Sequence, residues 1–245
     1  MKTIGLLGGT GWSSTIGYYT LLNEKVAQRL GGYHSAKIIL KSIDYHDIMS
    51  TYGQDHAVTA GILKTELLEL IKLNPDCIMI CCNSLHKYYD MIKSDLNSKI
   101  PVFHAVDLVA DHIKKQNYNK VLLLATKFTM EDGFFARTLR QAPDYAKAST
   151  GRQDEREDNG ITVVIPNLEE RNEMQRIHGE LMQNSVSQES RNYFGALIAK
   201  HNDCDAVVLG CTEYPLVVNQ SNSILPIIDP VQLQTSAAVD FALND

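Results

Sequence analysis

The chain has 245 residues, of which 44% are hydrophobic and 21% charged, and its formal net charge is −6. This length predicts one large or two small α/β domains, and the composition excludes a disordered or fibrous protein. The negative charge argues against non-specific nucleic-acid binding. No apolar run is long enough to span a membrane. The first residues lack a signal-peptide layout, so we expect a cytoplasmic protein.

Short apolar runs alternate with amphipathic stretches, which predicts buried parallel strands separated by helices. The expected strands are Ile4–Leu7, Lys37–Leu40, Cys77–Cys81, Val121–Ala125, Ile161–Ile165 and Ala206–Leu209. The expected helices are Tyr18–Leu30, Gly61–Leu73, Val106–Lys115, Glu131–Arg140, Glu170–Gln183 and Ser187–Lys200. The segment Gln141–Asn159 contains Pro143, Gly151 and a run of charges, and is expected to be an exposed loop.

Two parts of the chain resemble each other around a cysteine that ends an expected strand. Cys82 stands six residues after Asp76, and Cys211 stands six residues after Asp205. Two further pairs of segments match in the same order: Ile4–Leu7 with Val121–Leu124, and Ile100–Phe103 with Leu225–Ile228. We therefore expect two pseudo-symmetric α/β domains, residues 1–103 with 227–245 and residues 104–226, each a mostly parallel sheet flanked by helices.

The five cysteines are an odd number, which argues against a disulfide framework. Cys77, Cys81 and Cys204 are expected to be buried packing residues. A metal cluster of Cys77, Cys81, Cys82 and His86 is an alternative, but these residues lack the short paired spacing of such sites. We therefore expect no metal, and we expect His86 to be a packed or hydrogen-bonded residue.

Ligands of parallel α/β sheets bind at the carboxyl ends of the strands, where Cys82 and Cys211 stand. Two thiols on opposite faces of one carbon could remove a proton from one side and return one to the other, which is two-base racemisation or epimerisation. Without pyridoxal phosphate as an electron sink, hydrogen-bond donors must stabilise the carbanion. A thiol with an ordinary pKa of about 8.5 must also supply thiolate. The polar neighbours Asn83, Ser84 and Thr212 fit that need.

The chain also resembles the aspartate/glutamate racemase superfamily of cofactor-independent amino-acid racemases, over essentially its whole length. The landmarks are Ile4–Thr15, Cys82–Lys87, Ala125–Met130, Gly210–Glu213 and Leu225–Asp229. The resemblance implies two α/β domains with the active site in the cleft between them, no cofactor, and commonly a homodimer. We expect a small amino-acid substrate, with aspartate or broad specificity, and neither a nucleic acid nor a membrane as partner.

Residue by residue, the resemblance implies that Cys82 and Cys211 are the two catalytic bases. The substrate-binding residues that it implies are Thr10, Asn83, Ser84, Thr126, Thr212 and Glu213. Thr10 belongs to a glycine-rich loop that would close one side of the pocket, and Glu213 would support the protonation state of Cys211. Taken by themselves, Asn83, Thr126 and Thr212 also fit helix caps.

The chain departs from the family pattern at several of these positions. Thr10 and Trp12 stand where the family often has Met and Pro, and Ser84 stands where Thr is commoner. Family members that use acidic substrates often hold the distal carboxylate with a basic residue, whose position aligns with Glu173 here. Either Arg171 substitutes for it, or the substrate is not acidic, because Glu173 would repel a second carboxylate.

Three other functions remain open from the sequence. Gly9–Ser14 approximates the dinucleotide fingerprint G-x-G-x-x-G, which would indicate an oxidoreductase, although Ser replaces the third glycine and the expected acidic residue is missing. The others are a non-catalytic amino-acid-binding protein on the same fold, and an isomerase or decarboxylase of small dicarboxylates that uses the same cysteines.

Overall fold

The computed structural model describes residues 1–141 and 160–244, and its contacts divide the chain into two compact units. Unit 1 comprises Met1–Ala105 and Val231–Asp245, and unit 2 comprises Val106–Pro230. The boundary that we expected at residue 227 falls inside a strand, Ile227–Ile228, that pairs in the sheet of unit 2. The chain therefore crosses between the units next to Ala105 and again next to Pro230.

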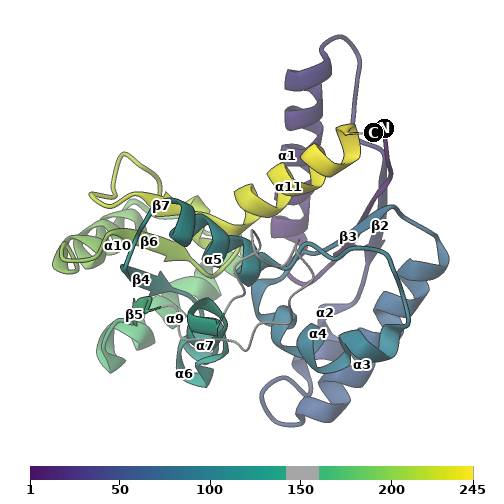
Figure 1. The fold of residues 1–245 in the computed structure, drawn as a ribbon. Helices are drawn as coiled ribbons and strands as arrows, with labels where there is room; N and C mark the ends of the chain where they lie inside the picture. Colours follow the sequence, from purple (N-terminus) through teal and green to yellow (C-terminus); the bar gives the residue numbers. More distant parts are fainter. Residues whose placement is uncertain (142–159, 245) are drawn as a thin grey trace. The chain divides into compact units, whose positions relative to one another are not determined.

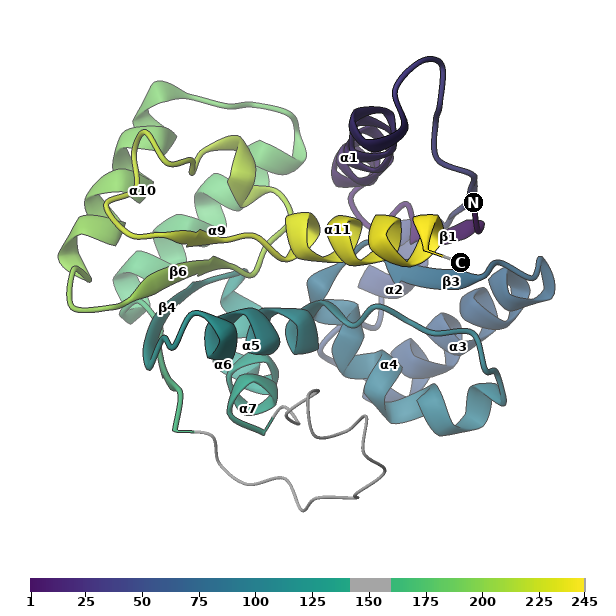
Figure 2. The same ribbon diagram turned by 45° about the horizontal axis from the view of Figure 1, so that its top comes forward.

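Unit 1 contains a parallel sheet in the order β2-β1-β3, and an isolated parallel bridge joins Ile78 to Val102 beyond β3. Its strands are β1 (Ile4–Gly8), β2 (Ile38–Ser42) and β3 (Cys77–Ile80). Its helices are α1 (Trp12–Leu30), α2 (Tyr45–Met49), α3 (His56–Lys72), α4 (His86–Ile92) and α11 (Pro230–Leu243), with the 3-10 turns η1 (Asn83–Leu85) and η2 (Lys93–Leu96). Figures 1 and 2 show α3 and α4 across the sheet from α1 and α11.

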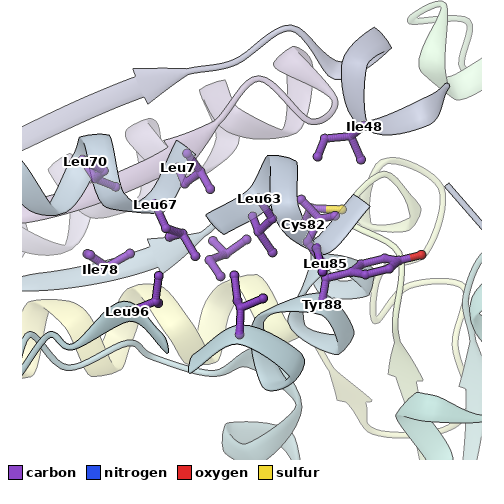
Figure 3. Packing of buried hydrophobic residues seen from close by; sticks show 13 residues of the cluster. Leu7, Ile48, Leu63, Leu67, Leu70, Ile78, Cys82, Leu85, Tyr88 and Leu96 are labelled. Atoms are coloured by element: carbon purple, nitrogen blue, oxygen red, sulfur yellow. The ribbon is translucent and has the colours of Figure 1, made fainter. Parts of the chain in front are cut away.

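Alternate residues of β3 point to opposite faces of this sheet, as the pleat of a strand requires. Ile78, Ile80 and Cys82 pack in a cluster with side chains of α2, α3 and α4 (Figure 3). Cys77, Met79 and Cys81 pack in a second cluster with side chains of α1 and α11. Because both faces are covered, β3 is apolar throughout, and this explains why an uninterrupted apolar run marks it in the sequence.

Unit 2 contains a parallel sheet in the order β5-β4-β6-β7. Its strands are β4 (Lys120–Leu124), β5 (Thr162–Val164), β6 (Ala206–Leu209) and β7 (Ile227–Ile228). The helices are α5 (Ala105–Lys115), α6 (Lys127–Asp132), α7 (Phe134–Gln141), α9 (Leu168–Met182) and α10 (Gln188–Lys200), with the 3-10 turn η3 (Tyr214–Leu216). The ribbon shows these helices around β4 and β6 (Figure 2).

The internal repeat is present in the backbone of the two sheets. The Asp76 carboxylate accepts a hydrogen bond from Thr3 N at the start of the neighbouring strand, at 2.5 Å. The Asp205 carboxylate accepts two at the equivalent place, from Asn119 N and Lys120 N, at 2.7 and 2.8 Å. Two further bonds match: Ile78 N donates to Pro101 O and Val207 N to Pro226 O, each at 2.9 Å. The α/β fold with parallel sheets flanked by helices, as the sequence predicts, is confirmed.

Several boundaries differ from the expected ones for local reasons. The expected helix at 131–140 is two helices, α6 and α7, which meet at Gly133 with φ of +72°. The left-handed conformation that glycine tolerates ends α6 there. Helix α1 begins at Trp12 rather than Tyr18, because the exposed residues of its first turns hide the apolar spacing.

Except for Gln141, which ends α7, the expected loop at 141–159 lies outside the described residues. In the part of the chain that the structure describes, no helix has the length and hydropathy needed to cross a membrane.

Candidate active site

Cys82 stands where β3 ends and the chain turns into η1. Cys81 N still donates to Leu7 O of β1, at 2.9 Å, and this bond fixes the end of the strand next to Cys82. Cys82 itself is extended and almost buried, with 8% of its surface exposed. Its Sγ lies 3.4 Å from the Ser84 hydroxyl oxygen. Figure 3 shows the sulfur at one end of the cluster, beside Leu85 and Tyr88. The strand thus places a thiol and a hydroxyl together.

The glycine-rich loop after β1 lies beside the end of β3. Gly9 has φ of +91°, and a Cβ there would lie 2.2 Å from Ile43 O, so this position requires glycine. Gly9 N donates to the Thr15 hydroxyl of α1, at 3.0 Å. The buried Thr10 hydroxyl donates to Cys81 O, at 3.4 Å. Thr10 is therefore bound to Cys81, the residue before Cys82.

His86 is a buried, hydrogen-bonded residue, as the sequence indicated. Its Nε2 accepts hydrogen bonds from Ala105 N at 3.3 Å and from the Gln234 amide at 3.4 Å, so this nitrogen carries no proton. The Tyr18 hydroxyl in turn donates to Gln234 Oε1, at 2.6 Å. Burial, and then the neighbouring His104, lower the pKa of His86 well below its ordinary value. His86 is thus a neutral acceptor in the core.

Cys211 follows β6 and lies in a buried polar group of unit 2. Its thiol donates to Glu213 Oε2 at 3.0 Å, and the Thr212 hydroxyl donates to the same oxygen at 3.0 Å. His178 of α9 places its Nε2 3.8 Å from that oxygen. Cys211 and Glu213 are 5% and 4% exposed. A thiol, a carboxylate and an imidazole therefore converge at the carboxyl end of β6.

The Glu213 carboxylate is ionised despite its burial. Burial by itself raises its pKa, but the nearby His178 imidazole and the hydrogen bonds from Cys211 and Thr212 outweigh this effect, and the pKa lies below its ordinary value. Its second oxygen, Oε1, has no hydrogen-bond partner among the described residues. Glu213 thus accepts the hydrogen bond of the Cys211 thiol with Oε2, which leaves Oε1 available to another group.

Tyr214 ties this turn to the neighbouring strand. Its buried hydroxyl donates to Ala125 O just after β4, at 3.1 Å, and its ring packs against the ring of Phe194. Thr126, the next residue, caps α6 by accepting from Thr129 N at 3.3 Å. These contacts of Thr126 agree with its interpretation as a helix cap.

The structure brings only some of the expected residues together. In unit 1, Cys82 meets Ser84, and Asn83 is buried in η1. In unit 2, Cys211 and Thr212 both donate to the same carboxylate oxygen of Glu213. His178 was not expected, because its partners lie on another element. The only sequence signal was its place next to the buried helix positions Met174, Ile177 and Leu181.

The three remaining cysteines are buried, as expected. Burial raises the pKa of Cys77 to about 12, and it raises the pKa of Cys81 and Cys204 as well. Cys77 and Cys81 face the opposite side of the sheet from Cys82, so they do not form the metal cluster considered above. Within the described residues, the group that could hold a metal is His178, Cys211 and Glu213.

Arg171 and Glu173, the two charged residues that the sequence analysis considered for substrate selection, are both bound to other groups of unit 2. Arg171 donates to Glu131 Oε1 at 3.2 Å and to Pro166 O at 2.6 Å. Glu173 is paired with Arg176 of the same helix at 2.7 Å, and this hydrogen bond lowers the Glu173 pKa. The charge of Glu173 is therefore compensated locally.

Comparison with known proteins identifies the family. The model of a family described as Asp/Glu/Hydantoin racemase matches residues 7–238. A broad-specificity amino-acid racemase from Bacillus subtilis is 23% identical over 238 residues, which cover 92% of each chain. A glutamate racemase from Clostridium acetobutylicum is 23% identical over 215 residues, which cover 83% of this chain and 77% of that protein.

Two solved structures are similar over the whole of both chains. An Asp/Glu racemase candidate from Yersinia pestis is 34% identical, with a TM-score of 0.82. An aspartate racemase homologue from Pyrococcus horikoshii is 27% identical, with a TM-score of 0.79. Since the family model matches residues 7–238, which include all five cysteines, the chain belongs to the Asp/Glu/Hydantoin racemase family.

Proposed function

We propose that the protein is a cofactor-independent amino-acid racemase of the aspartate/glutamate type, in which Cys82 and Cys211 transfer the α-proton of the substrate. The repeat carries this proposal. Cys82 follows β3, which pairs with β1, and Cys211 follows β6, which pairs with β4. The strands β3 and β6 therefore occupy equivalent places in their sheets. Each cysteine also stands six residues after an aspartate that binds the backbone at the start of β1 or β4.

In the proposed mechanism Cys82 acts on one face of the α-carbon of a bound amino acid, and Cys211 acts on the opposite face. One cysteine, as thiolate, takes the α-proton and becomes a thiol. The other, as thiol, gives its proton to the opposite face of the carbanion and becomes a thiolate. The substrate is inverted, and the two cysteines have exchanged protonation states. The reverse reaction uses the same groups in opposite roles.

The carbanion needs hydrogen-bond donors that are already in place. We assign Thr10, Asn83 and Ser84 of unit 1 to the α-carboxylate and amino group, together with Thr126 and Thr212 of unit 2. Their positions next to the ends of β1, β3, β4 and β6 support this assignment. The hydrogen bond from the Cys211 thiol to Glu213 orients that thiol, and we assign Glu213 to support the protonation state of Cys211.

We favour a broad side-chain specificity over a strict preference for aspartate. The Arg171 guanidinium is already bound by Glu131 and Pro166, so it is not a ready partner for a distal carboxylate. The likeness to a broad-specificity racemase over 92% of each chain supports the same choice. A screen of acidic, neutral and basic L-amino acids tests it. Turnover confined to aspartate and glutamate would overturn the choice without touching the mechanism.

The mechanism is tested by incubating single L-amino acids with the protein in deuterated water, with no added cofactor. We expect racemisation with uptake of α-deuterium, and its loss in both Cys82→Ala and Cys211→Ala. Cys77→Ala is the matched control, because Cys77 lies on the other face of the sheet and should leave the reaction intact. Racemisation that survives loss of either Cys82 or Cys211 would refute the two-base mechanism.

Other outcomes of the same experiment identify the alternative functions. Binding of an amino acid without isotope exchange would indicate a binding protein on this fold. Conversion of a small dicarboxylate, without amino-acid exchange, would indicate an isomerase or decarboxylase that uses the same cysteines. We also propose a homodimer, which light scattering on the purified protein tests. A monomer at the concentrations that support turnover would overturn that proposal.

A further inference from the structure

We propose that Cys211, Glu213 and His178 form a binding site for a soft divalent cation, Zn²⁺ above all, which the site accepts in exchange for the thiol proton. Sequence spacing predicts no such site, because His178 comes from α9 whereas Cys211 and Glu213 follow β6. Only the packing of α9 against this turn brings the three side chains together. All three residues belong to unit 2.

The spacing of the three ligand atoms fits one small cation. Cys211 Sγ lies 3.0 Å from Glu213 Oε2, and His178 Nε2 lies 3.8 Å from the same oxygen. One ligand atom from each residue lies within 4.8 Å of the other two. Zinc bonds of about 2.0–2.3 Å in a tetrahedron place the ligand atoms about 3.3–3.7 Å apart. Small rotations of the side chains would therefore close the observed triangle around a cation.

The charge and burial of the site also point to a cation. Glu213 is 4% exposed, and its Oε1 has no hydrogen-bond partner among the described residues. A buried carboxylate with an unpartnered oxygen is costly, and the positive charge of a bound cation offsets that cost. The side chain of His178 is 17% exposed, so the imidazole side of the site leaves a route for an ion.

Thiolate, imidazole and carboxylate together are ligands that Zn²⁺ prefers, and three protein ligands leave a fourth position open for water. Binding is an exchange without oxidation or reduction. The Cys211 S–H bond breaks, a sulfur–zinc bond forms, and the proton leaves to the solvent. His178 contributes the lone pair of a neutral imidazole.

The consequence for activity rests on the proposed function. A zinc-bound Cys211 can neither take nor give the α-proton, so occupancy should inhibit racemisation reversibly. A chelator should restore the activity completely, because no covalent change has occurred. Substrate that binds beside Cys211 should compete with the metal.

The binding itself is tested without substrate, by titrating the full chain with Co²⁺ as a spectroscopic stand-in for Zn²⁺. We expect a sulfur-to-cobalt charge-transfer band that Zn²⁺ removes. Cys211→Ser should abolish the band, and Cys82→Ser is the matched control that should keep it. His178→Gln and Glu213→Gln should weaken binding at least about 10–100-fold, the range already typical for partners outside the first coordination sphere. Circular dichroism checks that each variant is folded.

A band that survives Cys211→Ser, or folded wild-type protein without a band, would overturn the metal site. The racemase proposal would be unaffected in either case, because it depends on isotope exchange in metal-free buffer. Conversely, a band that depends on Cys211 in a protein that racemises nothing would support the metal site and refute the racemase. Inhibition by Zn²⁺ that is equally strong in wild type and His178→Gln would also contradict the site.

Discussion

Tyr214→Phe isolates one hydrogen bond that holds the Cys211 turn to the neighbouring strand. The change keeps the buried ring and removes only the hydroxyl, which donates to Ala125 O at 3.1 Å. The buried carbonyl loses this donor, and water cannot replace it, so we expect a loss of about 1–3 kcal/mol in the free energy of unfolding. For an m value of about 2 kcal/mol/M, a loss of 2 kcal/mol lowers the urea midpoint by about 1 M. Urea titration followed by circular dichroism measures the shift.

Tyr193→Phe is the matched control. The Tyr193 hydroxyl donates to Glu170 O at 3.2 Å, almost the same length, but this tyrosine is partly exposed. Water can replace the lost donor there, so we expect a loss of about 0.5 kcal/mol or less. If the two variants lose the same stability, burial does not set the cost of the Tyr214 bond.

Three further predictions concern the same framework. Gly210→Ala should cost about 1–3 kcal/mol and slow racemisation, because the new Cβ would lie 2.9 Å from Ala125 Cβ, next to Cys211; an unchanged urea midpoint and rate would contradict this. Asp205→Ala should cost about 1 kcal/mol at neutral pH. The pKa of Asp205 is lowered by the backbone donors Lys120 and Asn119, so this stability is present above the unfolded pKa of about 3.9 and is lost as pH falls through the folded pKa. Urea midpoints of wild type and variant should therefore converge in acid, and a constant difference would count against the bond. The pKa of His86 is also lowered, by burial and then by His104, so stability should fall as pH drops below the unfolded pKa of about 6.5, by up to about 1.4 kcal/mol per pH unit. His86→Gln should flatten this fall, and parallel pH curves would show that another group causes it.

The fold was predictable from local patterns because both sheets are parallel and their strands β1, β3, β4 and β6 are buried. Such strands must be continuous apolar runs, and each expected run lies on one of the strands β1 to β6. The repeat was also predictable, because Asp76 and Asp205 occupy equivalent places before β3 and β6. Strand β7 was not expected, because its two residues are too few to show a pattern. Helix α11 was not expected either, because its apolar residues do not form a single stripe.

The candidate site was only partly predictable. Cys82 and Cys211 stand out in the sequence because each ends a strand and has polar neighbours. Glu213 was expected to support Cys211, and its bond to the thiol is consistent with that role. His178 was not expected, because nothing in its own helix distinguishes it from a histidine that flanks a buried stripe. The contacts of Thr126 within α6 were expected only as an alternative.

The sequence by itself determined the strands β1 to β6, the internal repeat and the two cysteines, because these depend on residue type and short-range spacing. Only the tertiary structure decided which ionisable side chains lie next to one another. Glu213 meets His178 across two elements, Glu173 is compensated by Arg176, and Arg171 is bound by Glu131. A carboxylate acts on its surroundings through groups within a few ångströms, and those neighbours are set by packing rather than by position along the chain.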